Sequence, residues 1–111
     1  MRIILAVVVW CLFLIPPAFS EELDLELVLL ADATGSIDDE EIRFQRKGYA
    51  DAITDPSVLN AIASNIYGKI VVTYVEWADM HSQDVVVDWT VIDGPESAQH
   101  FATELMAAPR R

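Results

Sequence analysis

The sequence predicts an α/β fold, and the order of its hydrophobic patterns is the main reason. Along the 111 residues, runs typical of β-strands alternate with segments of helical periodicity. The order is one strand, two helices, a pair of strands and a final helix. In addition, the first strand ends in polar residues, as in open α/β sheets that bind ligands beyond the carboxyl ends of their strands. The length suffices for one small domain.

The first twenty residues, Met1–Ser20, have the pattern of a secretory signal peptide. Arg2 supplies the positive start, and the apolar run Ile3–Ile15 is shorter than a usual membrane span. Small residues within Ala18–Ser20 predict cleavage before Glu21. We therefore expect an exported protein, periplasmic or secreted, whose domain comprises residues 21–111. The alternative is an uncleaved membrane anchor.

The single cysteine, Cys11, lies in this leader, so the mature chain would have no disulfide bond. Lipid attachment at Cys11 is disfavoured because the bulky Trp10 precedes it. Loss of Arg2 with the leader would make the formal net charge of −11 one unit more negative. Such a charge argues against nucleic acid and anionic membranes as partners. A solvated acidic surface explains most of it.

The first strand leads directly into the candidate site. Leu27–Ala31 is a continuous apolar run, typical of a central strand that is buried on both faces. Asp32, Thr34 and Ser36 follow at alternate positions, so a tight loop can turn their side chains toward one point. One carboxylate and two hydroxyls form an all-oxygen set, which suits Mg²⁺, Mn²⁺ or Ca²⁺ rather than Zn²⁺.

The sequence Asp32-Ala33-Thr34-Gly35-Ser36 resembles the first loop of the metal-ion-dependent adhesion site in von Willebrand factor A domains. That motif is Asp-x-Ser-x-Ser after the first, central strand, and Thr34 replaces its middle serine but keeps a hydroxyl. The segments LVLLADATGSIDDEEIRFQRKGYADAI and VVTYVEWA resemble an uncharacterised family of secreted bacterial proteins with this domain. The resemblance covers nearly all of the chain after residue 20.

The resemblance implies a three-layer, Rossmann-like von Willebrand A fold, truncated to its first three strands with their helices. It also implies binding of a protein ligand through a divalent cation, Mg²⁺ or alternatively Mn²⁺ or Ca²⁺. Asp32 would act mainly through water, and Thr34 and Ser36 would be hydroxyl ligands. The resembled site takes ligands from three loops and this chain supplies the first, so we expect cation binding to be weak or absent.

Two helices are expected after the loop. The first would run from about Asp38 to Ile53, with the acidic residues Asp38–Glu41 at its start, where the helix dipole favours negative charge. Helix-start electrostatics is a better explanation of these carboxylates than metal ligation. Ile42, Tyr49 and Ile53 would share the buried face, whereas Arg43, Arg46 and Lys47 would point elsewhere. The second helix would begin at Asp55-Pro56, with Val58, Leu59 and Ile62 as its apolar stripe.

Two strands and a helix complete the expected order. Lys69–Trp77 and Asp84–Ile92 are rich in β-branched and aromatic residues, and the turn Ala78–Ser82 is too short for a crossover helix. These strands should therefore pair antiparallel as a hairpin, in which Trp77 and Trp89 could form a cross-strand pair. The last helix would begin around residues 93–96 and stop near residue 109. Its expected inner face is Ala98, Phe101, Ala102, Leu105 and Met106.

Other candidate residues are weaker. His81 and His100 are far apart in the sequence, so a surface position is the better interpretation of each. Glu76 interrupts an apolar strand near its carboxyl end, on the same side of the sheet as Asp32. We expect it to be exposed there; a supporting role behind the metal ligands is the less favoured alternative.

Catalysis is not expected. Ser36 lacks the Gly-x-Ser-x-Gly elbow, and no histidine is placed by sequence to activate it. Aspartyl phosphoryl-transfer sites need a second acid two residues after the first, where this chain has Thr34. No phosphate-binding glycine loop is present in the sequence. The alternatives to a cation-dependent binding domain are a metal-independent structural or interaction module and a non-functional truncated product.

Overall fold

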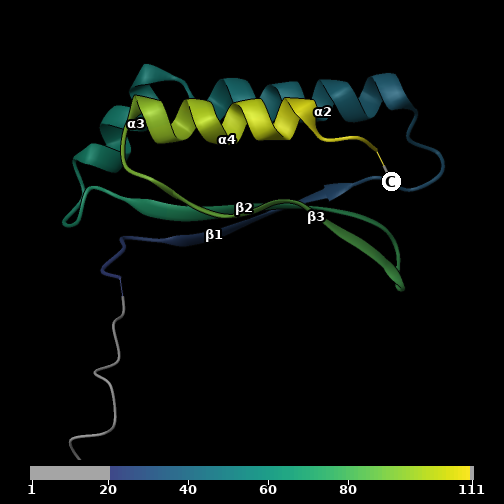
Figure 1. Cartoon of the computed structure of the whole chain (residues 1–111), viewed down its shortest axis with the longest axis horizontal. Helices are drawn as coiled ribbons and strands as arrows, with labels where there is room; N and C mark the ends of the chain where they lie inside the picture. Colours follow the sequence, from purple (N-terminus) through teal and green to yellow (C-terminus); the bar gives the residue numbers. More distant parts are fainter. Residues whose placement is uncertain (1–20, 111) are drawn as a thin grey trace, which may run out of the picture.

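The computed structural model describes residues 21–110, which form three strands and three helices (Figure 1). In chain order these are β1 (Glu26–Asp32), α2 (Asp39–Ile53), α3 (Pro56–Ala63), β2 (Ile70–Asp79), β3 (Ser82–Ile92) and α4 (Pro95–Ala107). The expected leader Met1–Ser20 and its cleavage site before Glu21 lie outside the described residues. Within residues 21–110, no helix is long and apolar enough to cross a membrane.

The three strands form one mixed sheet in the order β1-β2-β3. β1 pairs parallel to β2, with Leu29 opposite Tyr74, and β2 pairs antiparallel to β3, with Tyr74 opposite Val87. The predicted α/β class and the predicted antiparallel hairpin are therefore confirmed. The arrangement is compatible with a truncated Rossmann-like fold, in which a helical crossover joins the two parallel strands.

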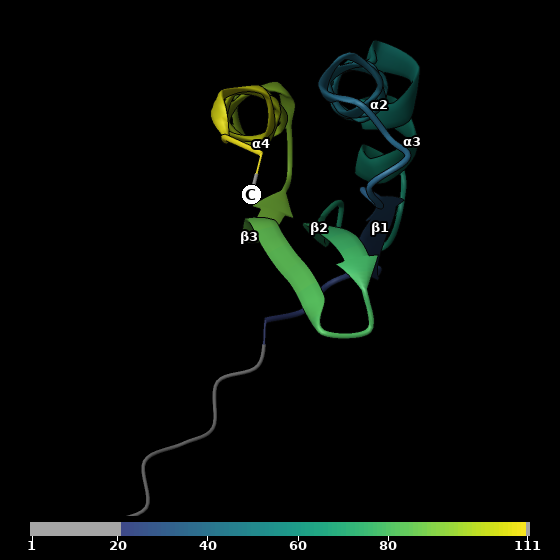
Figure 2. The ribbon, with the colours of Figure 1, turned by 90° about the vertical axis from the view of Figure 1, so that its right-hand side faces the viewer.

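All three helices lie over the same face of this sheet (Figure 2). The strand residues that point to the helices include Leu27 and Leu29 of β1 and the fully buried Val72 and Tyr74 of β2. The helices contribute to the core Ala50, Ile53, Ile62, Ala98, Phe101, Ala102 and Leu105. Alternation along the strands therefore divides the sheet into a face that is covered and a face that is not.

The uncovered face of the sheet carries exposed apolar side chains. On β1, Val28 and Leu30 are 51% and 60% exposed, and on β3 Val85 and Trp89 are 60% and 50% exposed. β1 is also an edge strand within the described sheet. The sequence pattern, a continuous apolar run, is that of a strand covered on both faces, yet helices cover only one face in residues 21–110.

Side-chain caps fix the starts of the first two helices. Asp38 precedes α2 and accepts a hydrogen bond from the Glu41 amide at 2.8 Å. Asp55 precedes α3 and accepts from the amides of Ser57 and Val58. The interpretation of the acidic segment as a helix-start feature is confirmed for Asp38, since the carboxylate satisfies an amide that has no partner within the helix.

Several details differ from the sequence predictions. The hairpin strands extend to Asp79 and from Ser82, so the connection is shorter than the expected turn Ala78–Ser82. Trp77 lies opposite Gln83, whereas Thr90, the neighbour of Trp89, lies opposite Val72, so the two tryptophans are several residues apart along the hairpin and do not pair. Met106 was expected on the inner face of the last helix but is 39% exposed.

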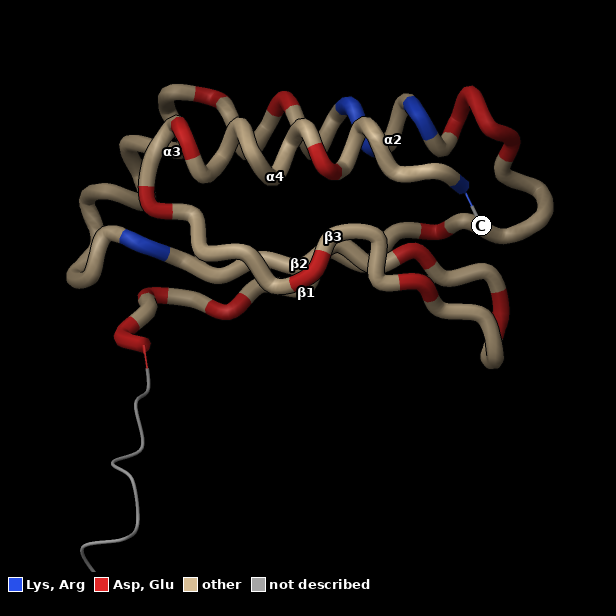
Figure 3. The backbone as a smooth tube through the Cα atoms, in the orientation of Figure 1, with Lys and Arg blue, Asp and Glu red and all other residues tan. Residues whose placement is uncertain are grey.

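The charged residues are unevenly distributed (Figure 3). Acidic residues lie along most of the chain, whereas within residues 21–110 every lysine and arginine except Lys69 lies on α2 or at Arg110. Arg110 follows α4 and contacts the backbone between β1 and α2. Most basic residues of the described chain are therefore on α2, and Arg110 contacts the loop that holds the candidate metal ligands.

Candidate functional site

The candidate site is the loop that joins β1 to α2. The Ala33 amide donates to the Trp77 carbonyl at 2.8 Å and so continues the β1–β2 ladder by one residue. The Thr34 amide then donates to Asp32 Oδ1 at 2.9 Å, and the Ile37 amide donates to the Thr34 carbonyl at 2.9 Å. These two bonds form a tight turn that is closed by the Asp32 side chain.

The turn brings the predicted ligand residues together. The hydroxyl oxygens Thr34 Oγ1 and Ser36 Oγ are 3.4 Å apart, within hydrogen-bonding distance. Asp32 contacts the backbone of Thr34 through its carboxylate, and both Asp32 and Ser36 are exposed. The three side chains therefore belong to one solvent-accessible loop at the carboxyl end of β1, which is where the sequence placed them.

The hydrogen bonds from Thr34 favour the ionised form of Asp32. The Thr34 backbone amide, followed by the Thr34 side chain, lowers the pKa of the Asp32 carboxyl below the ordinary 3.8. Hydrogen bonds to the ionised form favour that form. At neutral pH the loop therefore presents a full negative charge beside two neutral hydroxyls. Such a donor set matches a hard, oxygen-preferring cation.

Helix α2 supports this loop from one side. Gln45, one turn and a half into the helix, donates from Nε2 to the Asp32 carbonyl at 2.9 Å. This bond holds the last residue of β1 against α2 without using the Asp32 carboxylate. The side chain of Asp32 is therefore held by its own loop, and its backbone is held by the helix.

The next residue of α2, Arg46, is buried, contrary to the prediction that it points away from the core. It is 5% exposed and binds Glu76 of β2 through two hydrogen bonds, Nε to Oε2 at 2.9 Å and Nη2 to Oε1 at 2.8 Å. Glu76, expected to be exposed, is 6% exposed. Each prediction was wrong for the same reason, since a bidentate ion pair satisfies both charges within the fold.

The pair with Arg46 also determines the role of the Glu76 carboxylate at the site. Glu76 lies opposite Ala31 in the sheet, directly next to Asp32, but both its carboxylate oxygens accept from Arg46. The Glu76 carboxylate raises the pKa of the Arg46 guanidinium, so that group is charged throughout the range in which proteins fold. Glu76 therefore anchors α2 to β2 beside the loop, and its charge is neutralised there.

Sequence reasoning missed a further neighbour of the loop, Arg110. Its guanidinium donates to Asp39 Oδ1 at 2.7 Å, to the Ile37 carbonyl at 2.6 Å and to the Ala33 carbonyl at 3.5 Å. No local pattern could have indicated these contacts, because more than seventy residues separate the partners in the sequence. The folded chain alone brings them together.

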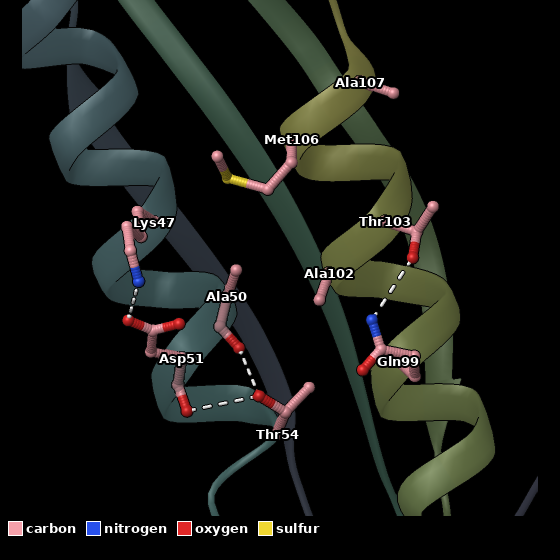
Figure 4. Close-up of a pocket in the computed structure, with 9 residues that line it drawn as sticks. All are labelled: Lys47, Ala50, Asp51, Thr54, Gln99, Ala102, Thr103, Met106 and Ala107. Atoms are coloured by element: carbon pink, nitrogen blue, oxygen red, sulfur yellow. Dashed lines mark hydrogen bonds and ion pairs between the residues drawn. The ribbon is translucent and has the colours of Figure 1, made fainter.

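Two hollows lie along α2, and the smaller one, beside the loop, is lined by charged residues that include Asp39, Arg46 and Arg110. A hollow of about 280 Å³ lies between the start of α2 and the segment after α4. A wider groove of about 580 Å³ lies between α2 and α4 (Figure 4), lined by Lys47, Ala50, Asp51, Thr54, Gln99, Ala102, Thr103, Met106 and Ala107.

The polar groups in this wider groove are already paired with one another. Lys47 binds Asp51 at 2.7 Å, the Thr54 hydroxyl donates to the Ala50 carbonyl at 2.8 Å, and Gln99 contacts Thr103 at 3.3 Å (Figure 4). These are bonds along single helices, so they point along the groove walls and do not converge on its centre. The groove therefore does not form a second candidate site.

The histidines take no part in the site. His81 lies in the hairpin connection and is exposed, and His100 is an exposed residue of α4 beside Glu104. Their surface positions agree with the sequence prediction. Among residues 21–110, no three or more side chains of histidine, cysteine, aspartate or glutamate are grouped to hold a metal ion. The candidate set of one carboxylate and two hydroxyls is of a different kind.

The fold and the loop define an α/β protein with a mixed sheet and a polar loop at the carboxyl end of its parallel edge strand. Residues 22–111 match the family described as protein of unknown function (DUF1194), and the chain belongs to this family. Comparison with curated proteins and with solved structures gave no match.

Proposed function

We propose that this chain is an exported domain of the von Willebrand factor A type, which binds a protein ligand through a divalent cation at the β1–α2 loop. The observation that supports this best is the convergence of the Thr34 and Ser36 hydroxyls, 3.4 Å apart, beside the ionised Asp32. The loop lies at the carboxyl end of a parallel strand, the position at which α/β sheets place ligands.

The spacing of the hydroxyls bears on the cation. Two neighbouring ligands of an octahedral Mg²⁺ lie about 3.0 Å apart, as follows from metal–oxygen distances of about 2.1 Å. The two hydroxyl oxygens are 3.4 Å apart, so Mg²⁺ would have to draw them together by about half an ångström. Ca²⁺, with its longer and more flexible coordination, requires less movement. The donor set therefore suits a hard cation, but the two hydroxyl oxygens are spaced too widely for Mg²⁺ unless the loop contracts.

The affinity should be low. The loop supplies one formal charge and two neutral hydroxyls, and the Glu76 charge next to it is neutralised by Arg46. With so few protein ligands, most of the Mg²⁺ shell stays as water. We expect a dissociation constant of about 1 mM or weaker, equivalent to no more than about 4 kcal/mol of binding free energy.

Titration with Mn²⁺, followed by paramagnetic broadening of amide resonances, measures such weak binding residue by residue. Broadening should be centred on residues 32–36, and both Asp32→Asn and Ser36→Ala should reduce it. Asp51→Asn is the matched control, because it removes an exposed carboxylate on α2 outside the loop. Broadening that is equally strong around Asp51 and Asp32 would contradict a specific site.

The role in partner binding needs a separate test. Proteins captured from the exported fraction by the domain should be lost when a chelator is added. Partners that persist unchanged in chelator would instead support a metal-independent interaction module. That alternative has an observation in its favour, namely the exposed apolar side chains Val28, Leu30, Val85 and Trp89 on the uncovered sheet face.

A further inference from the structure

Arg110 bridges the two ends of the candidate loop. Its Nη2 donates to the carbonyl of Ile37, at 2.6 Å, and to that of Ala33, at 3.5 Å, while Nη1 donates to Asp39 Oδ1 at 2.7 Å. Ala33 precedes Thr34, and Ile37 follows Ser36. The guanidinium thus contacts the backbone immediately before and after the residues that carry the candidate hydroxyl ligands.

The dipole of α2 does not explain the position of this cation. The positive end of the α2 dipole is at its N-terminus, which disfavours a guanidinium there. The carboxylates of Asp38–Glu41 counter this effect, and the specific acceptors of Arg110 are one of these carboxylates, that of Asp39, and two carbonyl oxygens. A guanidinium suits this role because its donors are fixed in a planar fork, whereas a lysine ammonium is a single point charge.

The backbone next to Arg110 is held by the buried Arg46. Arg46 Nη1 donates to the Ala108 carbonyl, and Nη2 lies 3.5 Å from the Pro109 carbonyl. Because Arg46 is itself fixed to Glu76, the segment 108–110 is tied to the β2–α2 interface. The Arg110 side chain therefore starts from an anchored backbone, and it is only 29% exposed.

We propose that Arg110 is a positioning residue, which clamps residues 33–37 in the turn that brings the Thr34 and Ser36 hydroxyls together. The purpose of the clamp rests on the proposed cation site, but the clamp itself is a property of the metal-free protein. Its partners are Asp39 and the carbonyls of Ala33 and Ile37. The ion pair with the exposed Asp39 alone would contribute little, so the carbonyl contacts are essential to the proposal.

Amide hydrogen exchange of the metal-free protein tests the clamp. In Arg110→Ala, the amides of Thr34 and Ile37 should exchange about tenfold faster, as expected for the loss of charge-assisted hydrogen bonds. Amides of the core, such as Val72 and Leu105, should keep their rates. Arg110→Lys should resemble Arg110→Ala, because it keeps the charge but loses the fork.

Matched variants separate the clamp from general charge effects. Lys47→Ala removes a basic residue of α2 that pairs with Asp51 outside the loop and should leave the loop amides unchanged. Asp39→Asn should accelerate loop exchange much less than Arg110→Ala does, because the carbonyl contacts of Arg110 remain, and it should have no further effect in the Arg110→Ala background. Glu40→Gln removes a neighbouring carboxylate from the same helix start. Its effect on loop exchange should be the same with Arg110 present and in the Arg110→Ala background.

Two results would overturn the proposal. One is loop exchange in Arg110→Ala at the rate of the Lys47→Ala control. The other is an acceleration of core and loop amides by the same factor, which would make Arg110 a contributor to global stability only. If Arg110→Ala fails to fold, Arg110→Lys provides the same comparison. Failure of the Mn²⁺ titration, with the exchange pattern as expected, would contradict the cation site and leave the clamp standing.

Discussion

The guanidinium of Arg46 joins three parts of the molecule at one point. It binds Glu76 of β2 in a bidentate pair, and it donates to the carbonyls of Ala108 and Pro109 after α4. Both members of the pair are about as buried as the apolar core. Such a pair adds little stability over a well-packed apolar pair, but the loss of one partner leaves the other charge buried and uncompensated.

Substitution of Arg46 should therefore be costly. We expect Arg46→Ala to lower the free energy of unfolding by about 3–5 kcal/mol, because the Glu76 carboxylate then loses its buried partner. The double variant Arg46→Met/Glu76→Leu should recover most of this loss. Urea denaturation measures both, with Lys47→Ala as the control, since its exposed pair with Asp51 contributes less than about 1 kcal/mol. A cost below that of the control would show that the buried pair is dispensable.

Substitution of Tyr74, in contrast to that of Arg46, should not lower the free energy of unfolding. Its side chain is fully buried against Tyr49, and its hydroxyl has no hydrogen-bond partner among the described residues. Burial, followed by the nearby Glu76 charge, raises the pKa of the Tyr74 hydroxyl, so it stays neutral. An unsatisfied buried polar group costs about 1–3 kcal/mol, so Tyr74→Phe should be neutral or stabilising by about 1 kcal/mol in thermal unfolding. A clear loss, absent in Tyr49→Phe, would mean that the hydroxyl is hydrogen-bonded.

Among the secondary-structure elements, those with local signals could be predicted from the sequence. Asp38 and Asp55 mark the starts of α2 and α3, and the β-branched run of residues 69–77 marks β2. The boundaries of the hairpin were less predictable, because cross-strand pairing rather than local propensity extends both strands. The burial of Arg46 could not be predicted, since its partner is thirty residues away and the helical pattern gives only the apolar face.

The cap of α3 makes one part of the stability dependent on pH. Hydrogen bonds from Ser57, through its side chain and its amide, and then from Val58, lower the pKa of Asp55 below the ordinary 3.8. A group whose pKa is lowered by folding stabilises the folded state above its unfolded pKa, and this contribution is lost as the pH falls through the folded pKa. The start of α3 should therefore fray below about pH 3.8.

Chemical shifts of the Ser57 and Val58 amides should follow this titration. Asp55→Asn should abolish the pH dependence but preserve most of the cap, because asparagine is an equally good N-cap residue. Asp55→Ala should remove both. If the two amides titrate in Asp55→Asn as they do in the natural sequence, another group is responsible.

At the scale of the whole molecule, the sequence located the candidate loop but not its surroundings. Asp32, Thr34 and Ser36 were identifiable because a strand, a turn and a helix start follow one another without interruption. Arg110 could be placed at the loop only by the fold. Glu76 was expected on the same side of the sheet as Asp32, but its buried pair with Arg46 is visible only in the fold. Local patterns therefore predict the ligands, and tertiary packing determines what holds them.

The last prediction concerns the uncovered face and the edge of the sheet. An exposed apolar edge strand is a template for association, and Val28 and Leu30 on β1 are more than half exposed. Half-covered sheets also bury little apolar surface, so the core is marginal at this size. We expect Glu21–Arg111 alone to form soluble oligomers or aggregates in size-exclusion chromatography with light scattering.

Charge placed on that face should reverse the association. Leu30→Lys puts a positive charge on the edge strand, a device by which natural sheets prevent edge pairing, and should shift the chain toward monomer. Ile66→Lys is the matched control, because Ile66 is 91% exposed but lies outside the sheet and adds the same charge. Equal effects of the two substitutions would point to net charge as the cause. A monodisperse, cooperatively melting monomer of the unmodified Glu21–Arg111 would contradict the prediction that the exposed apolar face causes association.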